Sequence, residues 1–238
     1  MKFKLDIHTH TISSGHAYST LSENADAARE NGLSMIGITD HGPAMPGGPH
    51  LYFFQCLRFL PETINEVRVL KGVEANITDL DGSLDLDAEV LSKMEIVIAS
   101  FHTICVKPGN QKENTYAIRK VIDNPYVNVI GHPGDTRYSF DIPEIVKAAS
   151  EANVLLEINN TSLMPVSFRP GGDLMIKEII LEVQNQDVPL VLGSDAHYKD
   201  DVGRMDKAYE LCRNCGFPDK QILNFNTEKF LRYISGKK

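Results

Sequence analysis

Short apolar runs rich in Val, Ile and Leu recur along the chain, and stretches with helical spacing of apolar residues separate them. Seven such runs occupy residues 3–8, 34–40, 67–74, 95–102, 127–132, 154–159 and 189–195. Continuous apolar runs are typical of strands buried on both faces, as in a parallel sheet covered by helices. Helices are expected at residues 20–32, 51–60, 86–94, 113–123, 142–153, 173–187, 201–215 and 227–234. The alternation therefore predicts an α/β fold.

Two architectures fit strands that are each followed by a helix: a barrel close to the (β/α)8 type and an open doubly wound sheet. No Gly-x-Gly-x-x-Gly turn follows a strand, which weakens the dinucleotide-binding version of the open sheet. The polar residues favour the barrel because they gather where the apolar runs end. Since 238 residues suffice for one such barrel, we expect a single domain over residues 1–238.

The net charge of −8 limits the partners that the chain can bind. Because the basic residues form no stripe, a polyanion such as duplex DNA would be repelled, and no stable nucleic-acid complex is expected. No apolar run is long enough to span a membrane, and the first residues do not resemble a signal peptide, so we expect a cytoplasmic protein. For the Cys212-x-x-Cys215 pair, which no second pair accompanies, two packed thiols are the favoured interpretation.

Ionisable side chains stand where the apolar runs stop. The first run ends in His8-x-His10, a spacing that places both imidazoles on one face of a strand. His16 follows one loop later, and the later run ends supply His41, Glu74, His102, His132, Asp195 and His197. Leaving these groups buried and unsatisfied would cost on the order of 1–3 kcal/mol each. Metal ions would supply the compensation, so this set predicts a metal site.

Nine potential ligands exceed the needs of one ion. A catalytic zinc takes about three protein ligands and keeps one position open for water. Nine ligands fit three ions, and mixtures of imidazole and carboxylate suit zinc, manganese or iron. Since active sites of α/β barrels assemble at the carboxyl ends of the strands, the set predicts a metal-dependent hydrolase.

The order of these motifs resembles that of the PHP (polymerase and histidinol phosphatase) superfamily. The resemblance rests on His8-x-His10, Thr39-Asp40-His41, Glu74, His102, His132 and Asp195-x-His197. With His16 included, the chain is most similar to the stand-alone bacterial phosphatases of the YcdX type. This resemblance implies a distorted (β/α)7 barrel of the TIM-like type and a trinuclear metal site.

The resemblance also implies how the ligands divide among three divalent ions, for which zinc is the first choice and manganese or iron the alternatives. The first ion would be held by His8, His10, Glu74 and Asp195, the second by Glu74, His102 and His132, and the third by His16, His41 and His197. A metal-bound hydroxide would attack the phosphorus of a small phosphomonoester. Glu74, Asp195 and His197 are the expected catalytic residues, the last two as candidates for proton handling.

Other polar residues flank the ligands. Asp6 and Asp40 could orient imidazoles through their free N–H groups or serve as turn carboxylates. Arg169 could bind a substrate phosphate and His50 could line the pocket, although a surface position fits either residue. Two amides, Asn159 and Asn160, could bind substrate, and three cations are expected on the solvated surface, namely Lys107, Arg137 and Lys199.

Three other functions remain open at this point. A phosphodiesterase or exonuclease would act on short nucleic acids, but the acidic surface disfavours a long polymer. An amidohydrolase-like deacylase would need a bridging carbamylated lysine, for which Lys71 is a candidate. A metal-binding module without turnover is disfavoured because the ligand set is intact.

Overall fold

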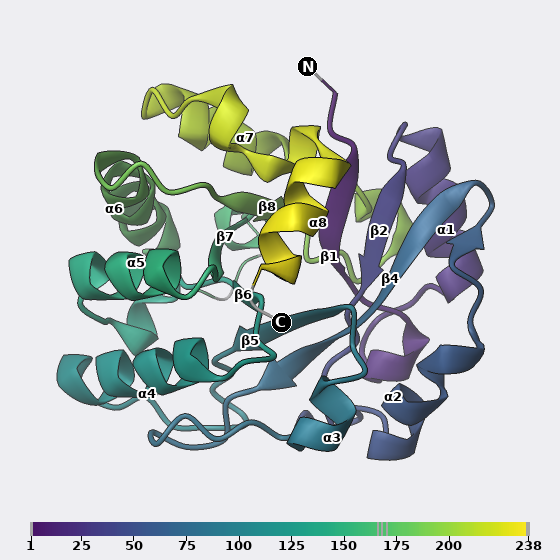
Figure 1. Ribbon diagram of the computed structural model, residues 1–238, viewed down its shortest axis with the longest axis horizontal. Helices are drawn as coiled ribbons and strands as arrows, with labels where there is room; N and C mark the ends of the chain where they lie inside the picture. Colours follow the sequence, from purple (N-terminus) through teal and green to yellow (C-terminus); the bar gives the residue numbers. More distant parts are fainter. Residues whose placement is uncertain (1, 166, 168, 170, 237–238) are drawn as a thin grey trace.

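The computed structural model contains a nearly closed barrel of seven parallel strands, which confirms the predicted architecture (Figure 1). The structure describes residues 2–165, 167, 169 and 171–236, so the remaining residues of the predicted domain lie outside the described residues. In order around the barrel the strands are β1 (Leu5–Thr9), β2 (Met35–Ile38), β4 (Val67–Asn76), β5 (Ile96–Ser100), β6 (Val129–Ile130), β7 (Leu155–Asn159) and β8 (Val191–Gly193).

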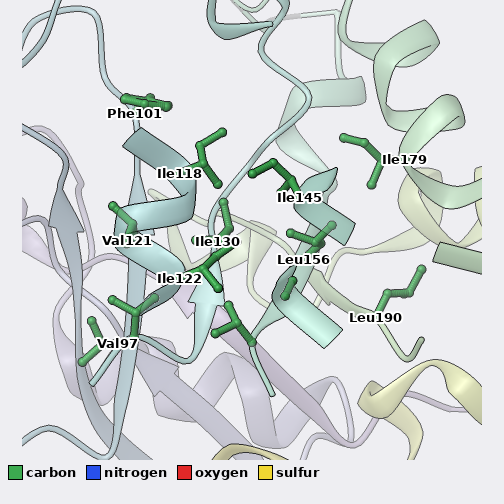
Figure 2. Close-up of a cluster of buried hydrophobic side chains, with 14 of the residues drawn as sticks. Val97, Phe101, Ile118, Val121, Ile122, Ile130, Ile145, Leu156, Ile179 and Leu190 are labelled. Atoms are coloured by element: carbon green, nitrogen blue, oxygen red, sulfur yellow. The ribbon is translucent and has the colours of Figure 1, made fainter. Parts of the chain in front are cut away.

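Helices alternate with these strands, and most of them cover the outside of the barrel. They are α1 (Leu21–Glu30), α2 (Leu51–Cys56), α3 (Ala88–Leu91), α4 (Gln111–Asp123), α5 (Ile142–Glu151), α6 (Gly172–Asn185), α7 (Asp206–Asn214) and α8 (Thr227–Ser235). In Figure 1, α4, α5 and α6 lie on one side of the strands, and α1 and α2 on the other. Figure 2 shows part of the core between the strands and these helices, where Val97 and Ile130 of the strands belong to one cluster with Ile118 of α4 and Ile145 of α5.

A second, smaller core fills the barrel interior. Leu5, Leu70, Ile98 and other inward-facing strand residues pack there against Phe230 of α8, which is fully buried. Helix α8, drawn in yellow in Figure 1, lies across the middle of the molecule and plugs the barrel interior with Phe230. The carboxyl ends of the strands, where the polar residues lie, are therefore free to form a site at the opposite mouth of the barrel.

The first and last strands meet along a seam that closes the barrel. Thr9 and Ala196 form a parallel bridge, and His10 N donates to Ala196 O at 2.9 Å. Farther along the seam, the Asn224 side chain replaces strand pairing. Its Oδ1 accepts from Leu192 N at 2.7 Å, and its Nδ2 donates to Leu5 O at 3.1 Å.

Several predicted elements are shorter than expected, and one was not predicted. The strand expected at 127–132 spans only Val129–Ile130, and the helix expected at 86–94 spans only Ala88–Leu91. A two-residue strand, β3 (Thr63–Ile64), pairs antiparallel with β4. Its turn places Asn65 and Glu66 at positive φ, and because the turn contains no glycine the sequence gives little sign of a hairpin.

Candidate metal centre

A β-bulge in β1 turns His8 and His10 toward the centre of the barrel. Leu5 and Ile7 pack in the barrel interior, so plain alternation would send His8 to the outer face. Instead, Asp6 aligns with Ile36 but Thr9 aligns with Ile38, which inserts one extra residue in β1. Both imidazoles consequently face the site and are fully buried. The predicted shared face is therefore produced by a bulge rather than by a regular strand.

Glu74 lies at the centre of the ring of histidines, at the carboxyl end of β4. It is fully buried, and each of its two oxygens faces different imidazoles. Oε2 lies 2.7 Å from His41 Nδ1, 3.4 Å from His8 Nε2 and 3.5 Å from His10 Nε2, whereas Oε1 lies 2.9 Å from His132 Nε2 and 3.4 Å from His102 Nε2. A carboxylate in this position can bridge two cations.

Asp195 approaches the same centre from the end of β8. Its Oδ1 lies 3.3 Å from His10 Nε2 and 3.5 Å from His197 Nδ1. The backbone of Asp195 has a φ of 57°, in the left-handed region that a non-glycine residue seldom adopts. Such strain at a polar residue is often found at functional sites, where the surrounding structure enforces it.

Histidine rings from three segments gather beside this pair of carboxylates. The ring of His16 lies 4.9 Å from that of His41 and 5.1 Å from that of His197, measured between centroids. His16 is the exposed member, in the loop after β1. All nine predicted ligands thus lie at one mouth of the barrel.

In the part of the chain that the structure describes, three groups of donor atoms are close enough together to hold metal ions, with all donors of a group within 4.8 Å of one another. These groups are His8–His10–Glu74, His41–Glu74–His102 and His10–His41–His197. Glu74 belongs to two of them, as its expected bridging position requires. The third group contains His10 in the place that the sequence prediction gave to His16.

The residues fit metal ions because several of their buried atoms lack a hydrogen-bond partner. Among the described residues, such atoms include His8 Nε2, His10 Nε2, His41 Nδ1 and Glu74 Oε2. An unsatisfied buried polar atom costs about 1–3 kcal/mol. Four such atoms in one cluster are explained if they coordinate cations.

The protonation equilibria in the cluster also suit metal binding. Burial lowers the pKa of His10, and the neighbouring imidazoles of His41 and His197 lower it further, which favours the neutral form that binds metals. Burial opposes ionisation of Glu74, but the imidazoles of His41, His8 and His102 hold its pKa well below the usual range. The carboxylate is therefore charged.

Three residues that were not predicted as site residues contact the imidazole nitrogens that face away from the centre of the site. Glu157 Oε1 lies 2.8 Å from His8 Nδ1, Asn76 Oδ1 lies 2.8 Å from His102 Nδ1, and Ser14 Oγ lies 3.1 Å from His10 Nδ1. With Nδ1 occupied, each Nε2 is directed toward the centre. The only sequence signal for Glu157 was a carboxylate inside an apolar run.

The two predicted flanking carboxylates differ in role. Asp40 accepts from Ser14 Oγ at 2.7 Å, so it supports the imidazole of His10 through that hydroxyl. Asp6 touches no imidazole, and its oxygens accept from the backbone amides of Ser194 at 3.1 Å and Gly203 at 2.8 Å. Asp6 is a structural residue of the barrel seam.

A cavity of about 510 Å³ opens above the cluster. Arg169 lines it and is buried, with Nη1 3.0 Å from Ser162 Oγ and 3.3 Å from Asp195 Oδ2. Arg137 also lines the cavity and pairs with Asp135 at 2.6 Å, which corrects the expectation of a solvated surface position. Met45, Phe101 and Ile104 form an apolar part of its wall.

The remaining candidates lie elsewhere. His50 is exposed at the start of α2, where its Nδ1 accepts from Tyr52 N, and it is not among the residues that line the cavity. Asn160 Oδ1 accepts from the first amides of α7. Because strand alternation places Glu74 toward the interior, Lys71 points outward, which excludes it as a bridging ligand. Lys107 is exposed, and Lys199 is half-buried.

Within residues 2–165, 167, 169 and 171–236, no helix is both long and apolar enough to cross a membrane. The four cysteines are free, and Cys212 is fully buried in the outer core.

Comparisons with known proteins agree with this geometry. A chain from Acetivibrio thermocellus described as a "probable phosphatase" is 47% identical over all of this chain and 98% of its own length. Another "probable phosphatase", from Clostridium novyi, is 44% identical over all of this chain and 96% of its own.

Solved structures share the fold at lower identity. Histidinol phosphate phosphatase from Lactococcus lactis, whose crystal structure contains zinc, L-histidinol and phosphate, aligns with a TM-score of 0.64 and 20% identity. The alignment covers 92% of this chain and 95% of that one. The model of the PHP domain matches residues 6–161. The chain therefore belongs to the PHP domain family.

Proposed function

We propose that this chain is a metal-dependent phosphatase that hydrolyses small phosphomonoesters. The observation that carries the proposal is the position of Glu74, whose two oxygens face five imidazoles, two of which, His41 and His102, line the cavity. The names of the relatives support phosphate-ester hydrolysis.

Three divalent ions, zinc first, would be held by this chain. The first would bind His8, His10, Glu74 and Asp195, the second Glu74, His102 and His132, and the third His16, His41 and His197. When bound, such ions supply Lewis acidity that activates water and neutralises phosphate charge. The zinc in the Lactococcus lactis structure supports this choice of metal.

Arg169 is the protein group best placed to bind phosphate. Its guanidinium lines the cavity beside Asp195, and its contacts with Ser162 and Asp195 hold it there before substrate arrives. A charged donor fixed in this way can bind phosphate oxygens without losing side-chain freedom at that moment.

The shape of the cavity supports a small monoester. At about 510 Å³ it can hold a compact molecule, and its apolar wall of Met45, Phe101 and Ile104 suits the organic part of an ester. The charge of bound cations would favour a terminal dianionic phosphate over an internal diester. The alternative nuclease function would need a longer basic surface.

Steady-state kinetics can test this function. After zinc loading, kcat/KM is compared for p-nitrophenyl phosphate, histidinol phosphate, bis-p-nitrophenyl phosphate and a single-stranded DNA oligonucleotide. We expect both monoesters to exceed the diester and the DNA. A diester or DNA preference of about tenfold, equivalent to about 1.4 kcal/mol, would replace the monoesterase assignment with a nuclease one.

A further inference from the structure

Glu157 is a buried carboxylate that has no part in the proposed reaction. It lies within β7 between Leu156 and Ile158, and it is fully buried. Its side chain faces the barrel interior close to Gly193, where an added Cβ would collide with Glu157 Oε1. Burying a charge in such a tight space is costly unless the charge has a defined set of partners.

The two oxygens of Glu157 reach two different ligands of the proposed metal site. Oε1 lies 2.8 Å from His8 Nδ1, and Oε2 accepts from the backbone amide of His132 at 2.6 Å. The backbone of His132 has a φ of 27°, in the region disfavoured for residues other than glycine. The bond to Oε2 therefore helps to hold a strained ligand backbone.

The two groups that hydrogen-bond to Glu157 Oε2 can act only as donors. One is the backbone amide of His132, which only donates. The other is Asn159 Nδ2 at 3.2 Å, whose orientation is fixed because Asn159 Oδ1 accepts from the backbone amide of Ser162 at 2.9 Å. Oε2 must therefore be an acceptor.

The imidazole of His8, by contrast, can donate or accept at Nδ1. A carboxylate only accepts, so Glu157 requires a proton on Nδ1 of His8. The lone pair of the neutral ring then lies on Nε2, which is 3.4 Å from Glu74 Oε2 and has no hydrogen-bond partner. This is the nitrogen that faces the proposed metal site.

We propose that Glu157 is a positioning residue that fixes the metal-binding tautomer of His8 and, through its other oxygen, the backbone of His132. One carboxylate thereby aligns ligands of two ions. The inference rests on the proposed metal site for its purpose, and the tautomer of His8 can be measured with zinc bound.

Glu157→Gln separates this role from simple packing because glutamine has nearly the same shape. Its single carbonyl oxygen must face the two fixed donors, so its NH2 group faces His8. His8 Nδ1 must then accept and carry no proton, and in the neutral ring the proton moves to Nε2, where it blocks metal binding.

The primary measurement is ¹⁵N NMR of zinc-loaded protein labelled at histidine, with His8 assigned from a His8→Gln spectrum. We expect the wild type to show zinc on Nε2 and a proton on Nδ1 of His8, and Glu157→Gln to lose the signal of zinc-bound Nε2. Chelator competition on the same samples should show zinc binding weakened about 10–100-fold in the variant.

Asp6→Asn is the matched control, since Asp6 is also a buried carboxylate beside β1 but accepts from the backbone amides of His8, Ser194 and Gly203. It should lower Tm without changing the signal of zinc-bound His8 Nε2. A zinc-loaded wild type in which His8 Nδ1 carries no proton, or a Glu157→Gln spectrum in which the signal of zinc-bound His8 Nε2 is unchanged, overturns the proposal. If Glu157→Gln does not fold, the wild-type spectrum decides alone. A wild type that binds no zinc would instead overturn the proposed function.

Discussion

At the scale of single residues, Glu74 is where the geometry of the site converges, since its oxygens lie within 3.5 Å of five imidazoles. An amide carries no negative charge and bridges cations poorly. We therefore expect Glu74→Gln to lose on the order of 100-fold in kcat/KM and at least one bound ion while remaining folded. Kinetics, elemental analysis and circular dichroism test this together. Near-normal turnover with unchanged metal content would rule out the bridging role.

Arg169 provides a second test at this scale. If its guanidinium binds phosphate, Arg169→Ala should reduce kcat/KM for phosphate esters by about 1.5–3 kcal/mol in transition-state stabilisation, with metal content unchanged. Arg169→Lys, which keeps the charge but not the two-pronged geometry, should recover part of the loss. If Arg169→Ala behaves as the wild type on every ester tested, Arg169 does not bind substrate.

The Cys212 thiol offers a test of the predicted packing. Burial raises its pKa to about 12, so almost none of it is thiolate near neutral pH. Native protein at about pH 8 should leave Cys212 unmodified by iodoacetamide, whereas unfolding in urea should make it reactive. Mass spectrometry of tryptic peptides locates the label. Rapid labelling of Cys212 in the native state would contradict the buried position.

At the scale of elements, α8 is the helix whose role, plugging the barrel interior, is least evident from its sequence. Phe230 is fully buried in the barrel interior, so Phe230→Ala should lower the free energy of unfolding by about 3–5 kcal/mol. Exposed Lys229 on the same helix supplies the control, because Lys229→Ala should change stability by about 0.5 kcal/mol or less. Urea denaturation measures both. Equal effects of the two substitutions would mean that α8 does not plug the barrel.

The strands and most ligands could be predicted because a buried parallel strand has an unbroken apolar sequence and the site begins where that sequence breaks. His41, Glu74 and Asp195 all follow this pattern. Glu157 escaped notice because it lies inside such a run, and its importance depends on a contact with His8 across 149 positions of sequence. The bulge in β1 was equally hidden, since it is defined by pairing with β2 rather than by local composition.

At the scale of the whole molecule, the protein has a net charge of −8, yet its most buried ionisable cluster is built to hold cations. There are three donor groups among the described residues, and Glu74, His10 and His41 each belong to two of them. We therefore expect three ions per chain in the metal-replete enzyme. Chelation should lower Tm because ligands that bind only the folded state stabilise it. Elemental analysis and calorimetry provide the measurements. Full activity at one ion per chain would remove the trinuclear proposal.

The seam between β1 and β8 has a consequence for how the protein is made. Leu5 near the start of the chain finds its partner in Asn224, and His8 shares a centre with Asp195. During synthesis, the first strand leaves the ribosome long before the segment that covers its open edge. Until the segment that contains Asn224 emerges, the edge of β1 that faces away from β2 is open and able to join other chains, so the nascent barrel is protected from aggregation only after that segment is translated.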